Sequence, residues 1–201
     1  MGILILGPTG AGKTPLGDCL QARGLWGRRG RHFDFGAALR RVAEPHNADG
    51  SLTGDELGVV RESLRTGALL DDENFPIARK ILTAFVAEGR DDDLIVLNGL
   101  PRNAGQARDV EAIVDVRVVV HLACTPEVAI ARIRANVEGD RAGRTDDDER
   151  AIRAKLDLFA RRSLPLAEHY RRRGARVETV PVAAETRSED IWLQLEARPK
   201  V

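Results

Sequence analysis

The sequence predicts an α/β fold of three layers, in which helices flank both faces of a five-stranded parallel sheet. Two observations carry this prediction. Short apolar runs alternate with segments of helical periodicity along the 201 residues of the chain, which is typical of a parallel sheet covered on both faces. The first apolar run is followed by a glycine-rich loop and a helix, the order that places an anion at a helix N-terminus. The length suits one domain with a buried core.

Five apolar runs are the expected strands, and they lie at about residues 2–7, 31–35, 94–97, 117–122 and 175–180. Helices are expected over about residues 14–23, 126–136, 146–160, 164–173 and 187–197. Residues 36–90 read as helical, with breaks near 45–51 and 66–71. That stretch is too long for a simple crossover between two parallel strands. We therefore expect an inserted substrate-binding subdomain there.

Residues Gly7–Thr14 fill every fixed position of the phosphate-binding pattern G-x-x-x-x-G-K-[ST]. Glycines in such a loop let backbone N–H groups converge on an anion, because side chains would block the approach. Lys13 is long enough to reach the terminal phosphates, and Thr14 offers a hydroxyl to a magnesium ion. The loop residues expected to bind ATP are Gly7, Pro8, Thr9, Gly10, Ala11, Gly12, Lys13 and Thr14.

The composition narrows the class of protein. Basic and acidic residues each number 31, so the formal net charge is zero and bulk charge does not favour a nucleic-acid partner. No apolar run is long enough to cross a bilayer, and the first expected strand begins at Met1 without room for a targeting segment. The cysteines and histidines show no metal-ligand or disulfide spacing. We expect a cytoplasmic monomer with no nucleic-acid or membrane partner.

The ligand site of such a sheet lies beyond the carboxyl ends of its strands. This rule brings together the phosphate loop, Phe35-Gly36, Asn98–Asn103 and the segment after Leu122. Arg102 follows a proline at the end of an expected strand. Its planar guanidinium is therefore placed to bind a phosphate through two nitrogens.

The segment Leu97–Gln106, Leu-Asn-Gly-Leu-Pro-Arg-Asn-Ala-Gly-Gln, resembles the D-G-F-P-R-T-x-x-Q motif of the adenylate kinase family, the nucleoside monophosphate kinases. The resemblance implies the P-loop NTPase fold. In that family the arginine contacts substrate phosphate and the glutamine reads the edge of the adenine. Arg102 and Gln106 match these two positions and are expected to have those roles.

Acceptor-binding segments of the family pattern follow in the same order along the chain. Residues 32–40 are similar to the family's S-T-G-D-L-L-R segment, which implies that Arg40 binds the monophosphate. Residues 53–70 resemble the helix and turn that close one side of the acceptor pocket. The residues expected to bind the acceptor are Asp34, Gly36, Arg40, Leu70, Gly99, Arg102 and Gln106.

Lid segments of the family pattern come next. Residues 126–133 are similar to the helix that enters the lid, and Arg132 matches its nucleotide-binding arginine. Residues 143–149 resemble the lid exit, which implies a catalytic role for Arg144. Lys155 stands where the family has a further arginine, so it supplies charge without a planar fork. The residues expected to surround the migrating phosphoryl group with positive charge are Lys13, Arg102, Arg132, Arg144 and Lys155.

The resemblance implies a single kinase domain with three parts. Residues 36–90 are the expected helical insertion that binds the acceptor. Residues 137–145 are the expected lid, a short loop without the cysteines of zinc-bearing lids. The core is expected to comprise residues 1–35, 91–136 and 146–201.

Several positions depart from the family pattern. Asn98 replaces the aspartate that helps to hold the hydration shell of magnesium, so an amide stands where a carboxylate is expected. Phe35 and Ala37 replace a threonine and an aspartate near the acceptor, and Asn136 replaces a second lid arginine. We expect Mg²⁺ to be bound by Thr14 and, through water, by Asn98. The substitution Asn98→Asp is then expected to strengthen magnesium dependence and raise turnover.

Asp34, at the end of the second expected strand, has two interpretations that the sequence leaves open. Its carboxylate can bind a hydroxyl of the acceptor or assist its deprotonation, and in this the chain is similar to the shikimate kinase group. Alternatively, Asp34 caps or orients the helix that follows.

These observations lead to one function hypothesis and two alternatives. The protein is expected to transfer the terminal phosphoryl group of ATP, with Mg²⁺, to a nucleoside monophosphate, and Gln106 favours AMP as the acceptor. A small-metabolite kinase is the first alternative, motivated by Asp34. The second is a nucleotide-binding regulatory protein with weakened catalysis, motivated by Asn98 and Asn136.

Overall fold

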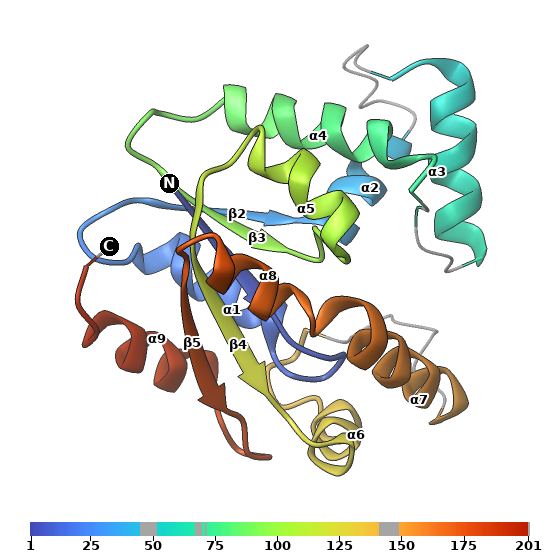
Figure 1. Ribbon diagram of the computed structural model, residues 1–201. Coiled ribbons are helices and arrows are strands. Elements are labelled where there is room, and N and C mark those ends of the chain that lie inside the picture. The colour runs from blue at the N-terminus through green and yellow to red at the C-terminus, as the bar shows by residue number, and fades with distance from the viewer. Residues whose placement is uncertain (45–51, 67–69, 71, 141–148, 201) are drawn as a thin grey trace.

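The computed structural model describes residues 1–44, 52–66, 70, 72–140 and 149–200. Its centre is a sheet of five parallel strands in the order β2-β3-β1-β4-β5 (Figure 1). The strands are β1 (Gly2–Leu6), β2 (Gly30–Asp34), β3 (Leu94–Asn98), β4 (Val116–Ala123) and β5 (Arg176–Pro181). The predicted three-layer α/β fold with a five-stranded parallel sheet is confirmed.

Helices cover both faces of this sheet. Successive side chains of β1 point to opposite faces, and those on each face are apolar and pack against helices. Ile3 and Ile5 pack in one buried cluster with residues of α1 (Lys13–Arg23) and α9 (Ser188–Glu196). Leu4 and Leu6 pack in a second cluster on the opposite face. The helices that contribute to this second cluster include α2 (Phe35–Ala43), α4 (Phe75–Ala87), α5 (Ala104–Glu111) and α8 (Leu166–Arg172).

The remaining helices stand at the carboxyl edge of the sheet (Figure 1). α3 (Gly54–Thr66) packs beside α2, and α6 (Pro126–Ala135) packs beside α7 (Glu149–Leu158). The α6–α7 pair has a small hydrophobic cluster of its own, formed by Ala129, Ile133, Ile152 and Leu156. A π-helical turn, η1 (Phe159–Ser163), follows α7 directly.

Side-chain caps set where three helices near the site begin. The Asp34 carboxylate accepts a hydrogen bond from the backbone N–H of Ala37, so it caps α2. Asn103 caps α5 through Gln106 N–H, and Thr125 caps α6 with Pro126 in the first turn. Each cap stands at or just beyond the carboxyl end of a strand, which turns the chain back over the sheet.

The structure corrects the expected elements in three places. Phe35 belongs to α2 and not to the second strand, because the cap at Asp34 starts the helix one residue earlier. The sequence analysis did not predict α5, whose eight residues give a weak periodic signal. The expected helices 146–160 and 164–173 are joined through the π-helical turn instead of being separated by a loop.

The expected division into core, insertion and lid stays a prediction. Within residues 36–90, α4 contributes Ile77, Ala78, Ile81 and Leu82 to the same core as β1. This helix is therefore part of the layer that covers the sheet. The expected break at 45–51, most of the expected break at 66–71 and most of the expected lid lie outside the described residues.

A buried carboxylate ties the beginnings of β2 and β3 together. Asp93 accepts hydrogen bonds from Arg29 Nε at 2.8 Å, from Arg29 Nη2 at 2.7 Å and from the Arg90 backbone at 2.8 Å. Its side chain is only 1% exposed. The Arg29 guanidinium, followed by the Arg90 N–H, holds the pKa of Asp93 well below its ordinary value.

This pKa predicts an acid-labile contribution to stability. A carboxyl group whose pKa is lower in the folded state stabilises the fold above its ordinary pKa and loses that effect as the pH falls. The free energy of unfolding should therefore drop steeply below about pH 4. The Asp93→Asn variant should be less stable than the wild type at pH 7 and should show a flatter acid limb. Denaturant unfolding across pH 2–7 measures both, and parallel curves for the two proteins would contradict the assignment.

Candidate functional site

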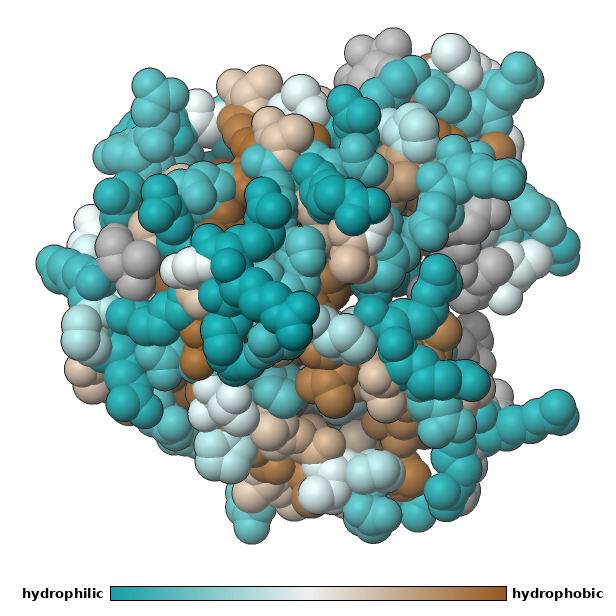
Figure 2. Space-filling view, in the orientation of Figure 1, coloured by the Kyte–Doolittle hydropathy of each residue, from teal (hydrophilic) through white to brown (hydrophobic). Residues whose placement is uncertain are grey.

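A cleft of about 1150 Å³ opens at the carboxyl ends of the strands. Its walls come from the phosphate loop, the ends of β2 and β3, α2, the end of α3, and α7 with η1. Figure 2 shows a mostly hydrophilic surface that is hollowed at its edge between α3 and α7. The described residues of the cleft wall that the sequence predicted are Gly7, Thr9, Gly10, Gly12, Lys13, Thr14, Asp34, Gly36, Arg40, Leu70, Asn98, Gly99, Arg102, Arg132 and Lys155.

Three predicted site residues are not in this wall, and a fourth is not described. Pro8 and Ala11 belong to the phosphate loop but do not line the cleft. Gln106 is buried beneath it, with 5% of its surface exposed. Arg144 lies outside the described residues.

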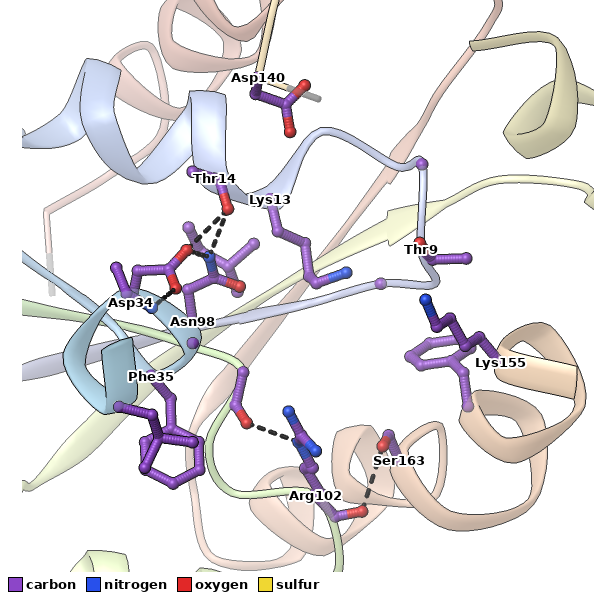
Figure 3. A pocket seen from close by; sticks show the side chains of 18 of the residues that line it. Thr9, Lys13, Thr14, Asp34, Phe35, Asn98, Arg102, Asp140, Lys155 and Ser163 are labelled. Carbon is purple, nitrogen blue, oxygen red and sulfur yellow. Dashed lines mark hydrogen bonds between the residues drawn. The ribbon is translucent and has the colours of Figure 1, made fainter. Parts of the chain in front are cut away.

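The phosphate loop has the shape that its glycines predict. Gly10 and Gly12 have φ angles of 83° and 90°, in the left-handed region that favours glycine. A Cβ atom on Gly10 would also lie 2.7 Å from the carbonyl oxygen of Ala129. The loop leads directly into the N-terminus of α1, and Lys13 Nζ donates a hydrogen bond to the Pro8 carbonyl at 2.7 Å. Lys13 thus projects across the concave side of the loop (Figure 3).

A hydrogen-bonded trio joins the loop to two strands (Figure 3). Thr14 Oγ1 donates to Asp34 Oδ2 at 2.7 Å. Asn98 Nδ2 donates to the same Oδ2 at 2.8 Å and to Thr14 Oγ1 at 3.0 Å. Asp34 and Asn98 are register partners at the ends of β2 and β3, so strand pairing brings their side chains together.

Asp34 uses both of its carboxylate oxygens. Oδ1 accepts from the Ala37 N–H at 2.8 Å, while Oδ2 faces Thr14 and Asn98. The capping interpretation of Asp34 is therefore confirmed. The contact with an acceptor hydroxyl stays a prediction.

Arg102 projects into the cleft from the loop after β3 (Figure 3). Its Nε donates to the Gly99 carbonyl at 2.9 Å, and its guanidinium lies 5.9 Å from the centre of the Phe35 ring. Phe35, which departs from the family pattern, thus presents an aromatic ring within cation–π range of this arginine. Burial lowers the pKa of Arg102 to about 10, against the opposing effect of Asp34. The guanidinium is still protonated at neutral pH, so it can bind an anion.

Arg132 has an unexpected set of partners. Its Nε donates to the Gly10 carbonyl at 3.0 Å. Its Nη1 donates to the carbonyls of Ala183, Ala184 and Thr186, at 2.9, 3.1 and 2.6 Å. The side chain is buried on α6 and ties the phosphate loop to the segment after β5. No sequence pattern marks residues 183–186 as partners, because backbone carbonyls are common to all residues.

Gln106 is held by groups of the protein itself. Its Oε1 accepts from the Arg102 backbone N–H at 2.9 Å, and its Nε2 donates to Asp72 Oδ1 at 3.0 Å. Asn103 Nδ2 donates to the same Asp72 oxygen at 2.9 Å. The sequence analysis missed Asp72, because one carboxylate among consecutive acidic residues belongs to no recognisable motif. The predicted contact of Gln106 with adenine is not tested by this arrangement.

The oxygen atoms at the trio suit Mg²⁺ in number and kind. Mg²⁺ is usually bound by one or two protein oxygens together with substrate phosphates and water. The Thr14 hydroxyl and the Asp34 carboxylate provide such oxygens beside the phosphate loop.

No cluster of three or more metal-ligating side chains occurs among the described residues. Over the same residues, none of the helices combines the length and apolar character needed to cross a membrane.

The contacts of Arg132 predict a structural effect that does not depend on nucleotide. Arg132→Met leaves its carbonyl partners without their donor, so the nucleotide-free protein should lose at least about 2 kcal/mol of stability, or about 4–8 °C in Tm. Arg134→Met is the matched control, because Arg134 is exposed on the same helix and its loss should cost under about 0.5 kcal/mol. Equal Tm values for Arg132→Met and the wild type without nucleotide would contradict this structural role.

Comparison with known proteins agrees with this geometry. A family model described as an AAA domain matches residues 3–153. An adenylate kinase of Synechococcus sp. (strain WH7803) is 32% identical, over 97% of this chain and 96% of its own length. An adenylate kinase of Haloarcula marismortui is 27% identical, over 96% of this chain and 94% of its own length. Similarity of this extent, together with a phosphate loop on a five-stranded parallel sheet, shows that the chain belongs to the adenylate kinase family of P-loop phosphotransferases.

Proposed function

We propose that the protein transfers the γ-phosphoryl group of ATP to a nucleoside monophosphate, with AMP as the preferred acceptor. One observation carries the proposal. A single cleft contains the phosphate loop with Lys13 and, in the same wall, Arg40 of α2 and Arg102 of the loop after β3. Two phosphate-binding surfaces in one cleft suit a donor and an acceptor that exchange a phosphoryl group.

The residues of the cleft divide between the two substrates. The loop N–H groups and Lys13 bind the β- and γ-phosphates of ATP, while Arg102 and Lys155 add positive charge between the substrates. Little covalent chemistry is required of the protein, because positioning and charge stabilisation account for most of the catalysis. Mg²⁺ bound with ATP would neutralise charge on the β- and γ-phosphates, with Thr14 as its ligand from the loop.

The acceptor occupies the part of the cleft next to α2 and α3. Arg40 and Arg102 bind its phosphate, and Leu70 and the backbone at Gly36 and Gly99 shape the space around it. Relatives named adenylate kinase support AMP as the acceptor. Gln106 reaches the adenine only after release from Asp72, so acceptor binding and this hydrogen bond compete.

The small-metabolite alternative has less support from the site. This alternative rests on Asp34, whose carboxylate caps α2 and faces Thr14 of the phosphate loop, on the side of the cleft assigned to ATP. The cytoplasmic location and the monomeric state stay predictions of the sequence.

A coupled assay with ATP, Mg²⁺ and each nucleoside monophosphate tests the proposal, and AMP should give the highest kcat/KM. Lys13→Met should lower kcat on the order of 100-fold or more, because it removes a charge from the developing transition state. Lys80→Met is the matched control, since Lys80 is exposed on α4 and pairs with Glu56 away from the cleft. Absence of turnover with every monophosphate would contradict the proposal.

A second prediction concerns the choice of acceptor. Gln106→Leu removes the amide while keeping side-chain volume, so the KM for AMP should rise about tenfold and the KM for ATP should not change. Steady-state kinetics with each substrate varied in turn measures this split. A lower Tm with an unchanged KM for AMP would show instead that Gln106 only supports the loop that carries Arg102.

A further inference from the structure

The Thr14 hydroxyl of the phosphate loop is hydrogen-bonded to a carboxylate at the end of β2. The family pattern has no carboxylate at that position of the strand. The pattern places its aspartate at position 98, where this chain has Asn98. We propose that Asp34, at the end of β2, supplies the negatively charged carboxylate of the site that binds the Mg²⁺ of ATP. In the family pattern the residue at position 98 supplies it. The inference deepens the proposed function and rests on its donor half, the binding of ATP.

Strand register makes this exchange of positions possible. Asp34 and Asn98 are direct partners in the parallel pair β2–β3, and their side chains approach to 2.8 Å. A carboxylate on either strand therefore ends at the same place, next to Thr14. Thr14 Oγ1 lies 2.7 Å from Asp34 Oδ2 and 3.0 Å from Asn98 Nδ2, so the loop hydroxyl meets both positions.

The hydrogen bonds of Thr14 leave one lone pair for a cation. A hydroxyl has one donor hydrogen and two acceptor lone pairs. The hydrogen of Thr14 is donated to Asp34, and one lone pair accepts from Asn98 Nδ2. The second lone pair can bind Mg²⁺ without breaking either bond. In this arrangement Asn98 is a positioning residue and Asp34 carries the negative charge.

The Asp34 carboxylate is held in a defined orientation. The N–H of Ala37 fixes Oδ1 at the start of α2, so Oδ2 is directed at Thr14. Other carboxylates of the cleft wall have different surroundings. Asp18 bonds to His32 Nδ1 at 2.9 Å, Glu138 accepts from the Ser188 backbone N–H at 2.6 Å, and Asp140 lies apart from the trio in Figure 3. Asp34 is thus the carboxylate of the described cleft wall that is hydrogen-bonded to the Thr14 hydroxyl.

The same geometry changes the expectation for Asn98→Asp. That variant alone would place a second carboxylate within about 3 Å of the first, where like charges repel. It should therefore be less stable than the wild type without Mg²⁺, so the gain in turnover expected from the sequence would come with a less stable metal-free protein. The exchange Asp34→Asn with Asn98→Asp keeps one carboxylate and moves it across the strand pair.

The test measures how strongly Mg²⁺ enhances ATP binding, by calorimetry with ATP in EDTA and in excess Mg²⁺. Electron paramagnetic resonance of Mn²⁺ with ATP gives a second readout of metal affinity. Asp34→Asn should reduce the enhancement about tenfold or more, the effect typical of losing a group that supports a metal site. The double variant Asp34→Asn, Asn98→Asp should recover most of it. Asp18→Asn, which changes another carboxylate of the same wall, should behave as the wild type.

Loss of the α2 cap does not confound this test. Asparagine caps helices as well as aspartate does, so Asp34→Asn should keep its Tm within a few degrees of the wild type. If that variant does not fold, Asp34→Ser keeps a cap acceptor without a charge and takes its place. Full magnesium enhancement in the variant would overturn the proposal. So would an equal loss in Asp18→Asn, or a double variant as weak as the single one.

The binding test and the acceptor assay can fail separately. Calorimetry with ATP and Mg²⁺ needs no acceptor, so inactivity on every monophosphate would leave the role of Asp34 supported while refuting the proposed reaction. Turnover of AMP with an unchanged magnesium effect in Asp34→Asn would refute the role of Asp34 and leave the reaction supported.

Discussion

The in-register parallel pairing of β2, β3 and β1 is the constraint on which the site depends. Parallel strands end at the same edge of the sheet, so the phosphate loop after β1 meets Asn98 and Asp34 there. A slip of one residue in β2 would move Asp34 by about 3.3 Å along the strand and break its bond to Thr14. The buried apolar side chains of the two core clusters hold the register, and thereby hold the trio in place.

Two arginines that match the family pattern, Arg102 and Arg132, contribute differently to the site because their partners differ. The Arg102 side chain bonds to one carbonyl, lies 5.9 Å from the centre of the Phe35 ring and keeps its charge at the cleft. Arg132 donates hydrogen bonds from Nε and Nη1 to four backbone carbonyls, one in the phosphate loop and three in the segment after β5. The first is suited to bind an anion directly. The second supports the loop that binds the anion, since its Nε bonds to the Gly10 carbonyl, and its own contact with nucleotide stays a prediction.

Local patterns allowed much of the fold and part of the site to be predicted. The phosphate loop, the apolar runs and the order of the family segments are all readable within short stretches, and the structure confirms the strands they indicate. The helix α5 was missed because its eight residues are too few for a clear period. The burial of Gln106 and its bond to Asp72 were missed because the first turn of α5 meets a loop 34 residues away in the chain.

The sequence by itself determined that this chain has a nucleotide phosphate loop on a parallel sheet, because Gly7–Thr14 and the run before it are contiguous in the chain. It also determined that position 98 has an amide where the family pattern has a carboxylate. Only the tertiary structure decided that the carboxylate beside Thr14 comes from Asp34. Positions 34 and 98 are 64 residues apart, and they become neighbours only when β2 pairs with β3. Hydrogen-bond distance is a property of the folded chain, so no spacing along the sequence could express it.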